Sequence, residues 1–127
     1  MNTEKVVFAF FIVLALTLNF GFFLGEMTVP DHHNVYELFA ALVVSLIATV
    51  MKFGDRTHMG AILLATSLVA DLQLIIAALI WGYASLVSDL GMDSAAIASV
   101  VSLSGGALLA NLLSAVLLAI ETVMIRR

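Results

Sequence analysis

The sequence predicts an all-α protein, an integral membrane four-helix bundle whose N and C termini lie in the cytoplasm. Composition is the first observation: 63% of the 127 residues are apolar and only 11% are charged, whereas a soluble domain is about half apolar and a quarter charged. The second observation is a set of four long apolar stretches separated by short polar ones. The third is that the basic residues fall on one predicted side of these stretches.

We expect a single transmembrane domain, residues 1–127, with a mean hydropathy of +1.17. Its predicted spans cover about residues 6–27, 35–53, 60–86 and 95–124. These lengths match the roughly 20 residues that a helix needs to cross a bilayer. The first stretch is longer than the core of a signal peptide, typically ~7–15 residues, so we expect it to remain as a membrane helix.

Local signals set the ends of the predicted helices. Pro30 lies in the polar connection TVPDHHN and is expected to separate the first two spans. Gly54, in the charged turn KFGDRTH, is expected to stop the second. Asp93 or Ser94 is expected to cap the N-terminus of the last helix, because a short polar side chain there can accept a hydrogen bond from a free backbone N–H.

The distribution of basic residues predicts the orientation. The five basic residues are Lys5, Lys52, Arg56, Arg126 and Arg127. They precede the first span, lie between the end of the second span and the start of the third, or end the chain, so the positive-inside rule places both termini and the middle connection in the cytoplasm. Glu121 is expected to reach the same interface and pair with Arg126 or Arg127. The net charge of −4 argues against a nucleic-acid partner.

Small residues at four-residue spacing predict close helix packing, because they let two backbones approach each other. The candidate packing residues are Gly21, Gly25, Ser45, Gly82, Ser102, Gly106, Ala110 and Ser114. Every predicted helix carries such residues, and four helices are few to surround a pore. We therefore expect some of these rows to meet a second copy of the chain in a homo-oligomer.

Asp71 is the candidate functional residue. It lies near the middle of the third predicted span, and the four spans contain no lysine, arginine or histidine at its depth to pair with it. A carboxylate at membrane depth is costly and usually marks a pathway or a partner, so we expect Asp71 to face protein or water and to be protonated unless water or a cation reaches it. Gln73, Asn19 and Asn111 fall at similar depth and are candidate neutral ligands. The alternative is that Asp71 joins helices by hydrogen bonds to Asn111 or Asn19.

Two functions follow from these alternatives. The first is an oligomeric pathway for a monovalent cation or a proton, with an acidic site at the midplane. The second is an accessory or assembly subunit that packs against a larger membrane transporter or channel, with Asp71 joining helices. We do not expect an enzyme, because no nucleophile–base pair or phosphate-binding loop is recognisable.

No metal or cofactor is expected. The sequence has no cysteine, which excludes disulfides and thiolate ligands. Imidazole and carboxylate side chains suit divalent transition metals, and His32 and His33 lie near Asp31 and Glu37. Adjacent histidines in a loop seldom suffice for such a site.

The segments HHNVYELFAALVVSLIATVMKFGDRTHMGAILLATSLVADLQL and SLSGGALLANLLS resemble a family of small inner-membrane proteins of proteobacteria that is known only as a domain of unknown function. The resemblance covers nearly the whole chain, from MNTEKVVFAFFIVLALTLNFGFF onward. It implies a self-contained four-helix unit in the bacterial inner (cytoplasmic) membrane. It implies no activity and no site residue.

Overall fold

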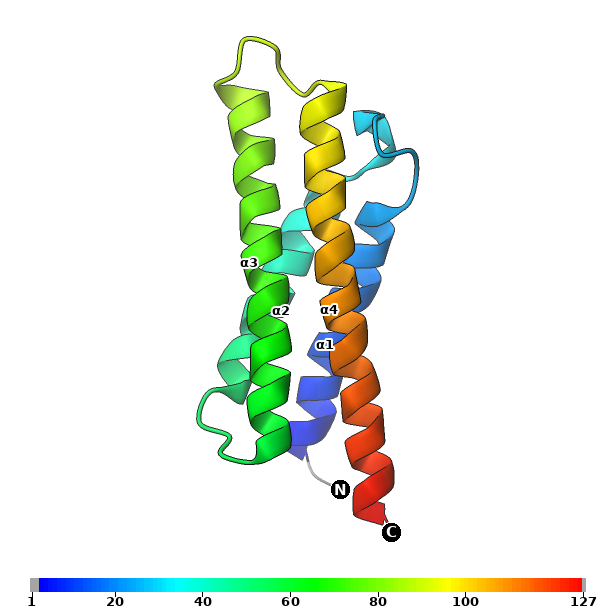
Figure 1. Ribbon diagram of the computed structural model, residues 1–127, viewed down its shortest axis with the longest axis vertical. Helices are drawn as coiled ribbons and strands as arrows, with labels where there is room; N and C mark the ends of the chain where they lie inside the picture. Colours follow the sequence, from blue (N-terminus) through cyan, green and yellow to red (C-terminus); the bar gives the residue numbers. More distant parts are fainter. Residues whose placement is uncertain (1–2, 127) are drawn as a thin grey trace.

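The computed structural model describes residues 3–126 as a bundle of four helices whose neighbours run in opposite directions (Figure 1). The elements in chain order are α1 (Thr3–Phe23), the short 3-10 helix η1 (Pro30–His32), α2 (Val35–Lys52), α3 (His58–Leu86) and α4 (Ser94–Arg126). The described range contains no strand. All four α-helices are long and apolar enough to cross a membrane, which indicates a multi-pass membrane protein.

The helices close into a ring. Each packs against its neighbours in the chain, α1 also packs against α4, and the α3–α4 interface is the most extensive. The buried apolar side chains form two separate clusters. The terminus-side cluster consists of Phe8, Ile12, Ala48 and Leu63. The far-side cluster lies toward the other end of the helices and is built around Phe22, Leu38, Leu74, Ile97 and Val101.

Polar caps explain where three of the helices begin. The Asn34 side chain accepts a hydrogen bond from Tyr36 N at 2.8 Å at the start of α2, and Thr57 Oγ1 accepts one from Gly60 N at 2.9 Å at the start of α3. Asp93 Oδ1 accepts a hydrogen bond from Ala96 N at 2.8 Å, so of the two predicted caps of α4 it is Asp93 that serves. These bonds satisfy backbone donors that have no partner within the helix.

The predicted end of the first span was wrong. The α1 helix ends at Phe23, and Gly25 follows it with a φ of 101°, a left-handed conformation that side-chain-bearing residues rarely adopt. Gly25 is therefore a residue of the connection and not a helix-packing residue. Pro30, which was expected to separate the first two spans, begins η1 within that connection.

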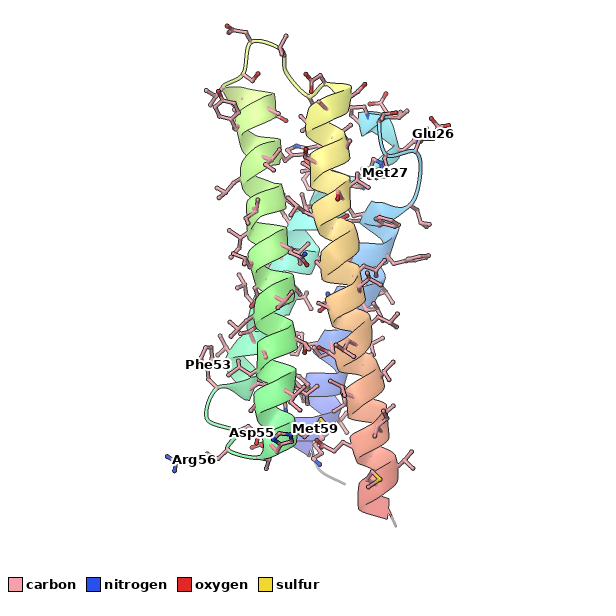
Figure 2. All side chains as sticks on the ribbon, viewed as in Figure 1. Glu26, Met27, Phe53, Asp55, Arg56 and Met59 are labelled. Atoms are coloured by element: carbon pink, nitrogen blue, oxygen red, sulfur yellow. The ribbon has the colours of Figure 1, made fainter. Side chains whose placement is uncertain are left out.

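Charged side chains tie the helices together at the end that carries both chain termini and the α2–α3 connection (Figure 1). Lys5 Nζ on α1 lies 2.9 Å from Glu121 Oε1 on α4, where a partner of Glu121 had been expected among the terminal arginines; those arginine side chains lie outside the described residues. Lys52 Nζ lies 3.4 Å from Asp55 Oδ2 and 4.2 Å from the centre of the Phe8 ring. Figure 2 shows Asp55 at this end of the bundle.

The turn before α3 is expected to weaken in acid. Hydrogen bonds from the side chain and backbone N–H of Thr57 to Asp55 hold the pKa of that carboxyl below its ordinary value, because they favour its charged form. A carboxyl whose pKa is lower in the folded state stabilises the fold above its unfolded pKa, and this stabilisation is lost as the pH falls through the folded value. Below a pH of about 4, we expect the protection of backbone amides against hydrogen exchange, relative to an unstructured peptide at the same pH, to fall at the start of α3. The Asp55→Asn variant should lack this pH dependence; an equal dependence in both proteins would contradict the assignment.

Candidate functional site

A belt of polar side chains crosses the interior of the bundle, and its acid, Asp71, lies between the two apolar clusters. Among the described residues, every buried polar side chain except His33 belongs to it. The polar belt consists of Asn19, Ser45, Thr49, Ser67, Asp71, Ser104, Asn111 and Ser114. Members of the belt join neighbouring helices. Asp71 joins α3 to α2, Asn19 joins α1 to α4, and Ser114 joins α4 to α3 through a 2.5 Å hydrogen bond with Thr66.

Asp71 is 4% exposed and faces protein, as expected. Ser45 Oγ donates a hydrogen bond to Asp71 Oδ1 at 2.7 Å, and the Thr49 hydroxyl is hydrogen-bonded to Asp71 Oδ2. Ser45 and Thr49 are four residues apart on α2 and so present their side chains to the same neighbour. The Thr49 hydroxyl also lies 2.9 Å from the Ser45 carbonyl oxygen. None of the described ion pairs includes Asp71, so its environment is one of neutral hydroxyl groups.

Asn19 has a different role from the predicted one. It is completely buried, and its carboxamide bridges two backbone groups of α4: Nδ2 donates to Ser104 O at 3.0 Å and Oδ1 accepts from Leu108 N at 3.0 Å. Both ends of the side chain are satisfied by α4, and the described partners of Asp71 are on α2. Asn19 therefore joins α1 to α4 and is not a ligand of the acid.

Asn111 lies in the belt, and Gln73 does not. Asn111 is completely buried, and neither its Nδ2 nor its Oδ1 has a hydrogen-bond partner among the described residues. Ser114 lies about one helical turn beyond Asn111 on α4 and bonds to Thr66, which places Asn111 about level with Val69 and Ala70, less than one turn from Asp71, on the antiparallel α3. Ser67 Oγ, one turn before Asp71, is also buried without a partner.

Gln73 packs between α3 and α4. A Cβ atom on Gly106 would lie 2.4 Å from Gln73 Nε2, so the absence of a side chain at Gly106 makes room for the glutamine. Gln73 lines a shallow, mostly apolar hollow on this side of the bundle together with Thr66, Val69 and Leu113. The four predicted ligands thus separate into Asp71 and Asn111 in the belt, Asn19 on the α4 backbone, and Gln73 outside the belt.

Apart from Gly25, which lies in the α1–α2 connection, the predicted packing residues also separate into two groups. Five of them make contacts inside the chain: Gly21 against Glu37, Ser45 with Asp71, Gly106 against Gln73, Ala110 on the far-side cluster, and Ser114 with Thr66. Gly82 and Ser102 do not belong to this group. A Cβ atom on Gly82 would meet no atom within 4 Å, and Ser102 is exposed.

His33 is a buried polar residue, and the sequence suggested it only as a possible metal ligand. Its Nδ1 lies 2.6 Å from Phe22 O and its Nε2 lies 2.8 Å from Glu26 O, so the ring holds the α1–α2 connection against the last turn of α1. His32 Nδ1 instead accepts a hydrogen bond from Glu26 N at 3.0 Å. The two histidines thus bond to backbone groups, and no three histidine, aspartate or glutamate side chains gather as possible metal ligands within the described residues.

Thr49 and Thr66 were also missed as partners in the site. Thr49 was recognisable in principle, because it follows Ser45 by one turn of α2. Thr66 pairs with Ser114 across the α3–α4 interface, and no spacing within one helix predicts a contact between two helices. Depth in the membrane can be read from a sequence, but the direction of a side chain around its helix is set by tertiary packing.

The model of DUF6394, a family of unknown function, matches residues 32–122. The chain belongs to this family. The DUF6394 match runs from the α1–α2 connection into α4 and includes Asp71, its two hydroxyl partners and Asn111, whereas Asn19 lies before it. No curated protein and no solved structure matches the chain. The predicted resemblance to a family of unknown function is thereby confirmed, and DUF6394 brings no activity with it.

Proposed function

We propose that this protein is a small multi-pass protein of the bacterial inner membrane that forms a homo-oligomer and conducts a proton or a monovalent cation, with Asp71 as the midplane site. One observation carries the proposal: Asp71 is buried halfway along α3 with no basic partner, held by the hydroxyl groups of Ser45 and Thr49. An acid in this position is costly unless its charge or its proton is used. Asn111 and Ser67 add buried polar atoms that are not committed to other partners.

The proposed orientation has both termini and the α2–α3 connection in the cytoplasm. The bundle brings these three segments to one end (Figure 1), where Lys5 and Lys52 are paired with acids and where Arg56 extends from the end of the molecule (Figure 2). Glu26 lies at the opposite end. Basic residues favour the cytoplasmic side of bacterial membranes.

Ion movement through this protein would require a conformational change. The terminus-side and far-side clusters are apolar and lie on either side of Asp71, so no continuous polar surface leads from Asp71 to either end within the described chain. We therefore propose that Asp71 is exposed to one side at a time by small shifts of the helices, rather than through an open pore.

The proposed homo-oligomer is supported by the outward-facing small residues. Gly82 on α3 and Ser102 on α4 have no packing role inside the chain, and small residues allow membrane helices to approach closely. We propose that a second copy packs against one or both of these positions.

The second candidate function is an accessory or assembly subunit of a larger transporter or channel. It is favoured by the fact that both described partners of Asp71 are on α2, so the acid joins two helices of the same chain. In that case Asp71 holds the bundle together, and the ion path belongs to another protein.

Ion flux into liposomes separates the two candidates. Purified protein would be reconstituted under a proton or potassium gradient, at matched oligomeric state, as wild type, Asp71→Asn and Asp55→Asn. The Asp55→Asn variant makes the same chemical change outside the membrane-spanning helices. We expect flux in the wild type and in Asp55→Asn, and flux no greater than in protein-free liposomes for Asp71→Asn.

Absence of flux from a folded, oligomeric wild type would overturn the conduction proposal. Copurification of that protein with a larger membrane protein would then favour the accessory role. Equal flux in wild type and Asp71→Asn would remove Asp71 from the path.

A further inference from the structure

We infer that the site at Asp71 binds a proton rather than a metal cation, and that Asp71 holds this proton in the resting protein and donates it in a hydrogen bond to Thr49. The identification of the proton as the conducted ion rests on the proposed function. The protonation state of Asp71 is inferred from the geometry of its hydrogen bonds and does not depend on the proposed function.

The contacts around Asp71 need more hydrogens than the two hydroxyl groups of the site supply. Three contacts need one each: Ser45 Oγ to Asp71 Oδ1 at 2.7 Å, Thr49 Oγ1 to the Ser45 carbonyl oxygen at 2.9 Å, and Thr49 Oγ1 to Asp71 Oδ2. The two hydroxyl groups supply only two hydrogens, because a serine or threonine hydroxyl donates once. A proton on Asp71 Oδ2 supplies the third, and Thr49 then accepts from the acid while it donates to the Ser45 carbonyl.

An ionised Asp71 fits the same geometry less well. The single hydrogen of Thr49 would be shared between the carboxylate and the Ser45 carbonyl, so one of the two contacts would lack a hydrogen of its own. The other members of the polar belt, contributed by α1, α2, α3 and α4, are all Asn, Ser or Thr and carry no charge. The described basic side chains of α1 and α2, Lys5 and Lys52, are paired with acids at the end of the bundle. A buried charge without a partner is strongly unfavourable.

A metal cation is a poorer occupant than a proton. A hard cation needs a shell of several oxygen ligands with lone pairs directed at it, whereas a proton needs one acceptor oxygen. Both carboxyl oxygens of Asp71 are engaged by hydroxyl groups at hydrogen-bonding distance, and no second carboxylate is present in the belt. The observed partners therefore match the requirements of a proton.

The two contacts of Thr49 also indicate how the site accommodates release of the proton. When Asp71 is protonated, Thr49 donates to the Ser45 carbonyl and accepts from the acid. When the proton leaves to water, the Thr49 hydroxyl rotates and donates to Asp71 Oδ2, so the carboxylate keeps a hydrogen bond on each oxygen. The step involves only transfer of a proton between the carboxyl group and water, and Thr49 is a positioning residue.

Infrared spectroscopy of the protein in lipid bilayers at neutral pH tests the protonation state directly. A protonated carboxyl group has a carbonyl stretch separate from that of a carboxylate. We expect a carboxylic-acid band in the wild type and in Asp55→Asn, and its loss in Asp71→Asn. In Thr49→Val, which keeps the shape of threonine and lacks the hydroxyl, the band should remain and shift, because the acid has lost its acceptor.

If Asp71→Asn does not fold, isotope labelling of the aspartate carboxyl groups in the wild-type protein reports the same state by nuclear magnetic resonance. Absence of a protonated aspartate would overturn the inference, as would loss of the band on addition of sodium or potassium ions. A protonated Asp71 in a protein that conducts neither protons nor potassium ions would instead overturn the proposed function, so the two failures can be distinguished.

Discussion

Phe22→Ala is expected to lower the free energy of unfolding by about 3 kcal/mol, the low end of the range for Phe-to-Ala changes in protein cores. Phe22 is completely buried in the far-side cluster, and its ring centre lies 5.4 Å from that of His33 and 6.0 Å from that of Trp81. Loss of the ring would leave a cavity where the α1–α2 connection meets α3. In a membrane most of this effect comes from lost packing, because lipid is as apolar as the protein core.

Phe20→Ala is the matched control for this prediction. It makes the same change two residues earlier on α1, but Phe20 is 49% exposed on the outside of the bundle. We expect its effect to be less than about 1 kcal/mol, because no enclosed cavity is created. Reversible unfolding in mixed detergent micelles, followed by circular dichroism, measures both. Equal losses in the two variants would show that Phe22 is not a packing centre.

Asn19→Leu and Asn111→Leu are expected to change stability in opposite directions. Asn19 bonds to Ser104 O and Leu108 N of α4, so its replacement should destabilise the fold by about 1–2 kcal/mol, the upper part of the range for hydrogen bonds between membrane helices. Asn111 has no described partner for either polar atom. Leucine has the same branching as asparagine and removes an unsatisfied buried amide, so Asn111→Leu should be neutral or stabilise the fold by about 1 kcal/mol.

The same unfolding measurement shows whether each substitution lowers or raises the free energy of unfolding. Destabilisation by both substitutions would mean that Asn111 makes a stabilising hydrogen bond in the folded protein, which would contradict the absence of a described partner for its amide. Stabilisation by Asn111→Leu together with reduced flux would link the unsatisfied amide to function, since residues that cost stability are typical of functional sites.

The helices could be predicted because length and apolar composition suffice for a membrane span. The end of α1 could not, because Pro30 suggested a later stop than the left-handed Gly25 imposes. At the site, the depth of Asp71 and its lack of a basic partner followed from the sequence. Its partners, Ser45 and Thr49, did not follow from the sequence. Gln73 is two residues from Asp71 and about 200° around the helix, so only one of these two side chains can face the belt, and periodicity alone did not say which.

The location of the partners of Asp71 has a consequence for biosynthesis. Ser45 and Thr49 lie on α2, upstream of Asp71 on α3, and the N-terminal part of a chain is made first. When the ribosome completes α3, the hydroxyl groups that receive its acid are already synthesised, so the acid can enter the bilayer together with its hydrogen-bond partners. Asn19 on α1, by contrast, must wait for α4, the last helix to be made, before its carboxamide is satisfied. Docking of α4 is therefore the step that completes the polar belt.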